Sequence, residues 1–314
     1  MNYRSIDERD SNPYYSEEAK QNAASPTKVK IISLGDFLQK EFPPRRNLIE
    51  PFLPEAGLAM VYAERGIGKT WFSLSLAYAV ASGGSFLKWH APEARKVLLL
   101  DGEMPANILQ ERLKIIVDNA QHEATIDALA IITPDLQEFG TMPDLATKEG
   151  QQSVAQYVQE ADLIIVDNIS TLCRTGKEND SESWIIVQEW ALQLRAQGKA
   201  VLFIHHAGKN GGQRGSSKKE DVLDTVISLK KPPDYENEGA RFEIHFEKHR
   251  GFYGEDAQPF EASLTDGQWT YKPIDNVRDE QVRRLNQEGY TYRQIAEKVG
   301  LGKSTVERII NKNG

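Results

Sequence analysis

Two glycines, a lysine and a threonine stand at a spacing that suits phosphate binding. They belong to the run 63–70, which has the sequence Ala-Glu-Arg-Gly-Ile-Gly-Lys-Thr. Glycines here allow a tight turn whose successive backbone N–H groups point at phosphate oxygens. Lys69 is expected to reach the β- and γ-phosphates, and the Thr70 hydroxyl to bind Mg²⁺. The run therefore predicts a P-loop that binds ATP together with Mg²⁺.

The segments on either side of this run support the prediction. An apolar strand-like segment, 58–62, precedes it, and an amphipathic segment, 71–81, follows it, as a P-loop requires. The start of that helix adds its partial positive charge. Ala63 replaces the first glycine of the motif at a position that only begins the turn. The alternative is a glycine-rich turn before a packed helix. We expect the nucleotide to contact Ala63, Glu64, Arg65, Gly66, Ile67, Gly68, Lys69, Thr70 and Trp71.

Two acidic residues follow apolar segments farther along the chain. Asp167 ends the run 163–167, ninety-eight residues after Lys69, in the Walker B pattern, where a carboxylate holds Mg²⁺ directly or through water. Glu103 follows the apolar segment 96–101, so it belongs at the carboxyl edge of a parallel sheet, where ligands bind. We interpret Glu103 as the base that orients the attacking water. Asp101 is the rival residue, and a helix-capping acid is the structural alternative.

A pair of histidines, His205 and His206, ends another apolar segment before a basic, glycine-rich loop. Adjacent residues of a strand point to opposite faces, so the pair cannot bind one metal ion. Sensing of the γ-phosphate is the better interpretation for one of them, and we choose His205. The single cysteine, Cys173, excludes an internal disulfide and a cysteine-based metal cluster.

The composition is that of an ordinary globular protein, with 39% hydrophobic and 27% charged residues among 314. No apolar run approaches the roughly 20 residues of a membrane helix, and the N-terminus lacks the pattern of a secretion signal. We therefore expect a cytoplasmic protein without a membrane partner. The net charge of −8 is uneven, because residues 276–314 carry eight Lys or Arg against five Asp or Glu. A basic tail on an acidic body suggests contact with nucleic acid.

The order of segments predicts a doubly wound α/β domain over residues 31–274, preceded by a flexible arm, 1–30, and followed by a small module, 275–314. Strands expected to be buried on both faces are 96–101, 128–133, 162–167, 200–205 and 221–229. Helical segments 105–120, 149–160 and 183–197 alternate with them, which indicates a mainly parallel sheet. Beyond residue 230 the segments 241–248, 258–264 and 268–271 alternate in polarity and predict an antiparallel extension.

The C-terminal module has the pattern of three short helices, 281–288, 292–299 and 303–311. Apolar residues fall where a helix-turn-helix packs its core, and Gly300 suits the turn. The module resembles the helix-turn-helix of resolvases and of sigma-like regulators. That resemblance implies contact with duplex DNA, and the alternative is a helical bundle that contacts protein. The exposed face of the third helix would offer Lys303, Ser304, Thr305, Arg308 and Lys312.

Together the P-loop, Glu103, Asp167, the histidine pair and the run Arg-Gly-Ser-Ser at 214–217 resemble the RecA-like ATPases. Within them the RepA-type hexameric helicases of plasmid replication are most similar, over roughly residues 35–270. The resemblance implies a catalytic role for Glu103 and a homo-oligomeric, hexameric ring around single-stranded DNA. Basic residues of the channel loops would then be Arg174, Lys177, Lys209, Lys218 and Lys219.

A ring ATPase usually completes its site with an arginine from the neighbouring subunit. Arg214 matches the RepA-type segment and is our first choice. Lys248 and Arg250 lie in a run that resembles the Lys-x-Arg element of replicative helicases and RadA proteins, and they are partners or rivals. The alternative for each is a solvated surface cation.

Three functions fit these residues. The first is an ATP-hydrolysing helicase that acts in the replication of a plasmid, phage or mobile element. The second is an ATP-dependent DNA-binding regulator that does not unwind. The third is a filament-forming recombination mediator, which the acidic body disfavours because phosphate contacts need a broad basic face.

Overall fold

The computed structural model describes residues 29–174, 181–208, 220–236 and 238–311. The chain divides into two compact units, of which the first ends at Pro44 and the second begins at Arg45. The first unit contains helix α2 (Leu34–Gln39), whose N-terminus is capped by the Ser33 hydroxyl. The predicted arm, 1–30, lies almost wholly outside the described residues.

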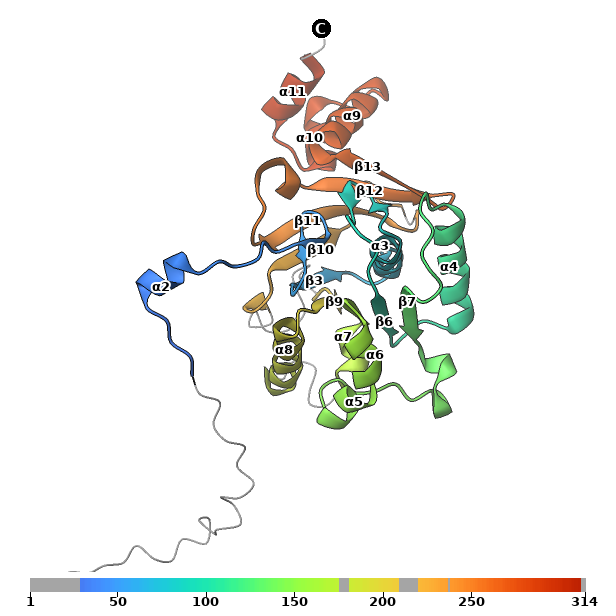
Figure 1. The fold of residues 1–314 in the computed structure, drawn as a ribbon. Coiled ribbons are helices and arrows are strands. Elements are labelled where there is room, and N and C mark those ends of the chain that lie inside the picture. Colours follow the sequence, from blue (N-terminus) through green and yellow to red (C-terminus); the bar gives the residue numbers. More distant parts are fainter. Residues whose placement is uncertain (1–28, 175–180, 209–219, 237, 312–314) are drawn as a thin grey trace, which may run out of the picture. The chain divides into compact units, whose positions relative to one another are not determined.

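The second unit alternates strands and helices before it ends in three helices (Figure 1). Its first half contains β1 (Asn47–Ile49), β2 (Leu53–Pro54), β3 (Leu58–Ala63), α3 (Lys69–Ser82), β4 (Ser85–Phe86), β5 (Trp89–His90), β6 (Val97–Asp101), α4 (Ala106–Asp118), β7 (Leu129–Ile132), η1 (Pro134–Leu136), η2 (Glu138–Gly140), α5 (Lys148–Ser153) and α6 (Ala155–Glu160). Its second half contains β8 (Leu163–Asp167), α7 (Ile169–Leu172), α8 (Ser181–Ala196), β9 (Ala200–His206), β10 (Thr225–Lys230), β11 (Arg241–His249), η4 (Gly254–Ala257), β12 (Phe260–Thr265), β13 (Gln268–Pro273), α9 (Ile274–Gln287), α10 (Tyr292–Val299) and α11 (Lys303–Asn311).

Within the described residues, nine strands form one sheet in the order β13-β12-β11-β10-β3-β9-β8-β6-β7. The six strands from β10 to β7 are parallel, whereas β11, β12 and β13 continue the sheet in antiparallel fashion. The predicted α/β fold, mainly parallel with an antiparallel extension, is thus confirmed. All residues of β3, β6 and β8 are buried, which explains their continuous apolar sequences.

Two apolar cores cover the two faces of this sheet. Alternate residues of β3 divide between them: Val61 belongs to the core that contains the α3 residues Phe72 and Leu76, whereas Met60 belongs to the core that contains Trp190 of α8. Helix α3 is buried along nearly its whole length and ends at Gly83, which adopts the left-handed conformation of a C-cap. The central strands and α3 therefore hold the loop between them in a fixed place.

The largest differences between predicted and observed elements concern three of them. β10 begins at Thr225 rather than at residue 221, because Asp224 exchanges hydrogen bonds with Leu58 and the preceding residues form a turn. The helix predicted over 149–160 is interrupted at Val154, so that it forms α5 and α6. α9 begins at Ile274 rather than at residue 281, and its buried residues include Ile274 in the first turn as well as Val282 and Leu285 farther along.

The C-terminal helices α9, α10 and α11 share a small core of their own. Thr291 begins α10 with a capping box, and Gly300 ends it in the left-handed conformation. α10 and α11 have the bounds expected for a helix-turn-helix, which is confirmed. Among the residues that the structure describes, no helix is long and apolar enough to span a membrane.

Candidate nucleotide site

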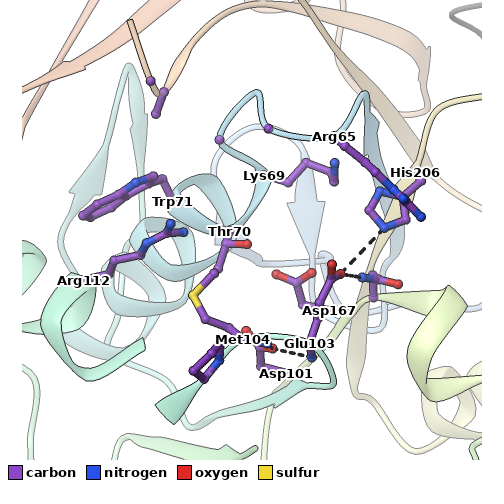
Figure 2. A pocket seen from close by; sticks show the side chains of 16 residues that line it. Arg65, Lys69, Thr70, Trp71, Asp101, Glu103, Met104, Arg112, Asp167 and His206 are labelled. Carbon is purple, nitrogen blue, oxygen red and sulfur yellow. Dashed lines mark hydrogen bonds and ion pairs between the residues drawn. The ribbon is translucent and has the colours of Figure 1, made fainter. Parts of the chain in front are cut away.

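A cavity of about 450 Å³ opens above the P-loop. The parallel strands β3, β6, β8 and β9 all end there, as ligand sites of open α/β sheets require. Figure 2 shows Trp71 and Arg112 on one side of Lys69, and Arg65 and His206 on the other. The lining residues are Arg65, Gly66, Gly68, Lys69, Thr70, Trp71, Asp101, Glu103, Met104, Pro105, Arg112, Asp167, Asn168, His206, Gly239 and Ala240.

The P-loop turn depends on its glycines. Gly66 and Gly68 have φ angles of 79° and 109°, which side chains rarely adopt. A Cβ atom on Gly68 would also lie 2.7 Å from the Cβ of Ala240, so the loop packs closely on the segment before β11. Ile67 between them is fully buried in the core and does not line the cavity. The loop is therefore fixed by packing as well as by turn geometry.

Lys69 folds back onto its own loop. Its Nζ donates hydrogen bonds to the carbonyl oxygens of Ala63 (3.1 Å) and Glu64 (2.7 Å). Only 8% of the residue is exposed. Burial lowers the pKa of Lys69 to about 8, although Asp167 and Glu103 favour the charged form. Ala63 and Glu64 thus contribute carbonyl oxygens that hold the lysine, rather than cavity-lining side chains.

Two carboxylates lie side by side at the ends of neighbouring strands. Asp101 and Asp167 are register partners in β6 and β8, and both are buried. Asp167 Oδ2 accepts a hydrogen bond from Ser73 Oγ at 2.8 Å. Burial and, to a smaller extent, the neighbouring Asp101 carboxylate together raise the pKa of Asp167 to about 7. A cation beside these carboxylates would relieve this unfavourable placement of negative charge.

This donor set fits Mg²⁺, which prefers oxygen ligands and usually keeps several waters. Asp167 would hold the ion directly or through water, and Thr70 would add its hydroxyl, which lines the same cavity. When bound, the ion would neutralise charge on the phosphate oxygens. Within the described ranges no three His, Cys, Asp or Glu side chains cluster to hold a metal ion by themselves.

Glu103 and its rival Asp101 have different environments. Asp101 Oδ1 accepts hydrogen bonds from the backbone N–H groups of Glu103 (2.9 Å) and Met104 (2.8 Å). Asp101 therefore shapes the turn, whereas the Glu103 side chain is 61% exposed and faces the cavity. Glu103 Oε2 accepts from Asn168 Nδ2 at 2.6 Å and lies 3.8 Å from His206 Nε2. This geometry favours Glu103 as the group that can reach a water in the cavity.

Only one histidine of the pair lines the cavity, as the alternation of side chains along a strand predicts. That residue is His206 and not His205. His205, the residue that we chose from the sequence, is buried and is not among the lining residues described. The prediction of a polar group near the γ-phosphate therefore moves to His206. The first choice failed because a sequence does not show which face of a strand meets the ligand.

Arg112, Asn168 and the pair Gly239–Ala240 are lining residues that the sequence analysis missed. The Arg112 guanidinium lies 5.1 Å from the centroid of the Trp71 ring, a cation–π contact. Arg112 is three residues after the buried Leu109 on α4, so helical spacing could have placed it near the sheet. Gly239 and Ala240 come from the distant segment before β11, for which the sequence offers no local signal.

Lys248 and Arg250 lie far from the cavity of their own chain. β11 is antiparallel to β10, so its last residues lie at the amino edge of the parallel strands, opposite the P-loop. Lys248 Nζ donates to the carbonyl oxygens of Glu220 and Asp221, and Arg250 Nη2 donates to that of Asp221 at 3.5 Å. Any contact with a nucleotide would have to involve another copy of the chain.

The structure describes only some of the predicted DNA contacts. Arg174 is exposed, and its guanidinium donates to the carbonyl oxygen of Met142. On α11, Lys303, Ser304 and Arg308 are exposed and Thr305 is half-buried. The predicted residues Lys177, Lys209, Arg214, Lys218, Lys219 and Lys312 lie outside the described residues.

Solved structures with a similar fold include a KaiC-like protein of the hyperthermophilic archaeon Pyrococcus horikoshii. It superposes with a TM-score of 0.53 at 16% identity, over 73% of this chain and 100% of that one. A second similar structure is an ATPase domain with a TM-score of 0.50 and 13% identity, over 69% of this chain and 85% of that one. At these identities the likeness shows the fold, and it confirms the predicted RecA-like architecture.

Two family models match the sequence. The model of the resolvase helix-turn-helix domain matches residues 275–313, in agreement with α9, α10 and α11. The model of an AAA domain matches residues 23–212, which include the P-loop, Glu103, Asp167 and the histidine pair. The chain therefore belongs to the AAA domain family and carries a resolvase-type helix-turn-helix at its C-terminal end.

Proposed function

We propose that this protein is an ATP-hydrolysing motor that acts on DNA, in the manner of a ring helicase. The observation that carries the proposal is the convergence of Lys69, Asp167 and Glu103 in one cavity, on a chain that also has a helix-turn-helix. Lys69 would hold the phosphates and Asp167 the Mg²⁺ ion. Glu103 would accept a proton from the attacking water, because its exposed carboxylate faces the same cavity.

A homo-oligomeric ring, predicted as a hexamer, would complete this site. The described cavity has Arg65 and Arg112 from its own chain, and Arg250 lies at the opposite edge of the sheet. An arginine from the next copy, either Arg214 or Arg250, would stabilise charge in the transition state. Single-stranded DNA would pass through the ring along Arg174 and the neighbouring basic residues.

A forked DNA duplex tests the motor proposal. With ATP and Mg²⁺ the intact protein is expected to displace one strand, and with a non-hydrolysable ATP analogue it should bind the fork without displacing it. Strand separation requires repeated hydrolysis, so the two nucleotides should give different products in a gel assay. ATP hydrolysis without displacement would contradict the motor and favour an ATP-dependent regulator, the second candidate, which the helix-turn-helix supports.

The helix-turn-helix is expected to contribute duplex binding through Arg308, which is exposed on α11. Arg308→Ala should lower duplex affinity at matched salt and reduce the slope of log K against log salt by about one if Arg308 contacts a phosphate. Loss of preference at a single base pair would indicate a base contact instead. ATP hydrolysis should be unchanged, because α11 has no residue in the cavity.

A matched control and a truncation complete this test. Glu307→Ala removes an exposed charge of the opposite sign from the same helix, and should not weaken binding. Deletion of 276–314 should spare ATP hydrolysis and weaken duplex binding. If the truncated protein binds duplex as tightly as the intact chain, the three helices contact protein rather than DNA.

A further inference from the structure

The Glu103 side chain accepts a hydrogen bond from a buried donor, Asn168. Its carboxylate is 61% exposed, and an exposed glutamate ordinarily samples several rotamers. Here Asn168 Nδ2 donates to Glu103 Oε2 at 2.6 Å, and Asn168 is only 1% exposed. A buried donor therefore orients one oxygen of a carboxylate that otherwise faces the cavity.

Asn168 is held in turn by the start of α7. Its Oδ1 accepts the N–H of Thr171 at 3.3 Å, and its own N–H donates to Thr171 Oγ1 at 3.5 Å, which forms a capping box. The amide oxygen is committed to the helix N-terminus, so the amide nitrogen must point the other way, at Glu103. The orientation of the side chain follows from this cap.

The turn that carries Glu103 packs directly on the same cap. Gly102 donates its N–H to the carbonyl oxygen of Asp167 at 2.7 Å, and a Cβ atom on Gly102 would lie 2.5 Å from Thr171 Oγ1. Asp101 holds the backbone of this turn through the N–H groups of Glu103 and Met104. The backbone of Glu103 is thus held by Asp101 at the end of β6, and its side chain by Asn168, directly after β8.

We propose that Asn168 is a positioning residue for the general base, orienting the Glu103 carboxylate toward the attacking water. This inference rests on the proposed role of Glu103 in ATP hydrolysis. The Asn168 amide occupies Oε2 and leaves Oε1 to accept a proton from water. An amide donor orients the carboxylate and cannot itself supply a proton to it. His206 Nε2, at 3.8 Å from Oε2, is too distant to replace this contact.

Asn168→Asp tests the proposal, because it replaces the amide donor by a carboxylate that repels Glu103 and keeps the oxygen that caps α7. Asp is as good an N-cap as Asn, so the bond from the Thr171 N–H is kept, while Glu103 faces a carboxylate that cannot donate to it. We expect kcat for ATP hydrolysis with Mg²⁺ to fall about 10- to 100-fold, as misplacement of a catalytic group predicts. The dissociation constant of a non-hydrolysable ATP analogue should change less than about threefold, because Asn168 contacts no P-loop residue in the described hydrogen bonds.

Two further variants separate positioning from a structural role. Thr171→Val removes the hydroxyl from the capping box but leaves the Asn168 side chain beside Glu103, so kcat should stay within about twofold of the wild type while the melting temperature falls. Asn168→Asp in a Glu103→Gln background should cause no additional loss of kcat, because the two residues would act as one unit. In this double variant the amide introduced at position 103 can donate to the carboxylate introduced at position 168, so the melting temperature should stay near that of the wild type while hydrolysis remains lost.

The outcomes distinguish this inference from the proposed function. If Glu103→Gln lacks hydrolysis but Asn168→Asp retains wild-type kcat, the positioning role is overturned and the base assignment survives. If Asn168→Asp loses as much activity in the Glu103→Gln background as alone, Asn168 acts through another group. If Glu103→Gln hydrolyses ATP normally, the base assignment fails, and the positioning role fails with it.

Discussion

Replacing Glu103 by Gln is expected to reduce ATP hydrolysis about 100-fold or more, the loss that follows removal of a general base. The amide has nearly the shape of the carboxylate and lines the cavity in the same place, but it cannot accept a proton from water. Binding of ATP should be spared, because Lys69 and the P-loop backbone are unchanged. Steady-state hydrolysis with Mg²⁺, together with binding of a non-hydrolysable ATP analogue, measures the two effects separately.

Asp101→Asn is the matched control for this prediction. Asn keeps the oxygen that accepts from the N–H groups of Glu103 and Met104, so the turn should persist. If Asp101 only shapes the turn, this variant should lose much less activity than Glu103→Gln. The opposite result, with Glu103→Gln active and Asp101→Asn inactive, would transfer the role of base to Asp101.

The sequence predicted the elements whose signals are local. The P-loop, β3 and α3 follow from glycines, a buried apolar run and a helical segment that stand next to one another. The start of α9 was missed because residues 274–280 are mostly polar, and only packing of Ile274 shows that the helix has begun. Periodicity detects an apolar stripe and gives little warning of a helix that buries few side chains.

The site residues that lie at the ends of recognisable strands were proposed from the sequence. The lining residues that come from segments distant in the sequence were missed. Asp167 ends β8, Glu103 follows β6, and Lys69 begins α3 after the loop that follows β3, so parallel pairing of these strands brings them to one edge. Asn168 stands directly after Asp167, and a polar residue at that place could have been considered. Ala240 is distant from Gly68 in the sequence. The two become neighbours because the sheet has the strand order β11-β10-β3.

Lys69→Ala is expected to weaken binding of ATP by about 3 kcal/mol, on the order of 100-fold in Kd, because a charged donor to phosphate is lost. Lys231→Ala is the matched control: this lysine pairs with the Glu64 side chain at 3.2 Å beside the same loop, but does not line the cavity. As an exposed ion pair it should contribute at most about 1 kcal/mol. Equilibrium titration with a fluorescent ATP analogue measures both variants, and similar losses would show that local charge, rather than the Lys69 contact, governs binding.

The pKa of Lys69 predicts that the affinity for ATP depends on pH. In the protein without nucleotide, burial lowers that pKa to about 8. Phosphate oxygens favour the charged ammonium, so nucleotide binding must raise the pKa and take up a proton wherever Lys69 is neutral beforehand. Below about pH 7 Lys69 is charged before the nucleotide binds, so its contribution to the affinity for ATP should not change with pH. The affinity should fall as the pH rises through about 8, where Lys69 loses its proton in the free protein. Lys69→Ala should lack this decline. If the variant and the wild type lose affinity in parallel between about pH 7.5 and 9.5, a different group is titrating, and the assigned role of Lys69 in charge recognition is wrong.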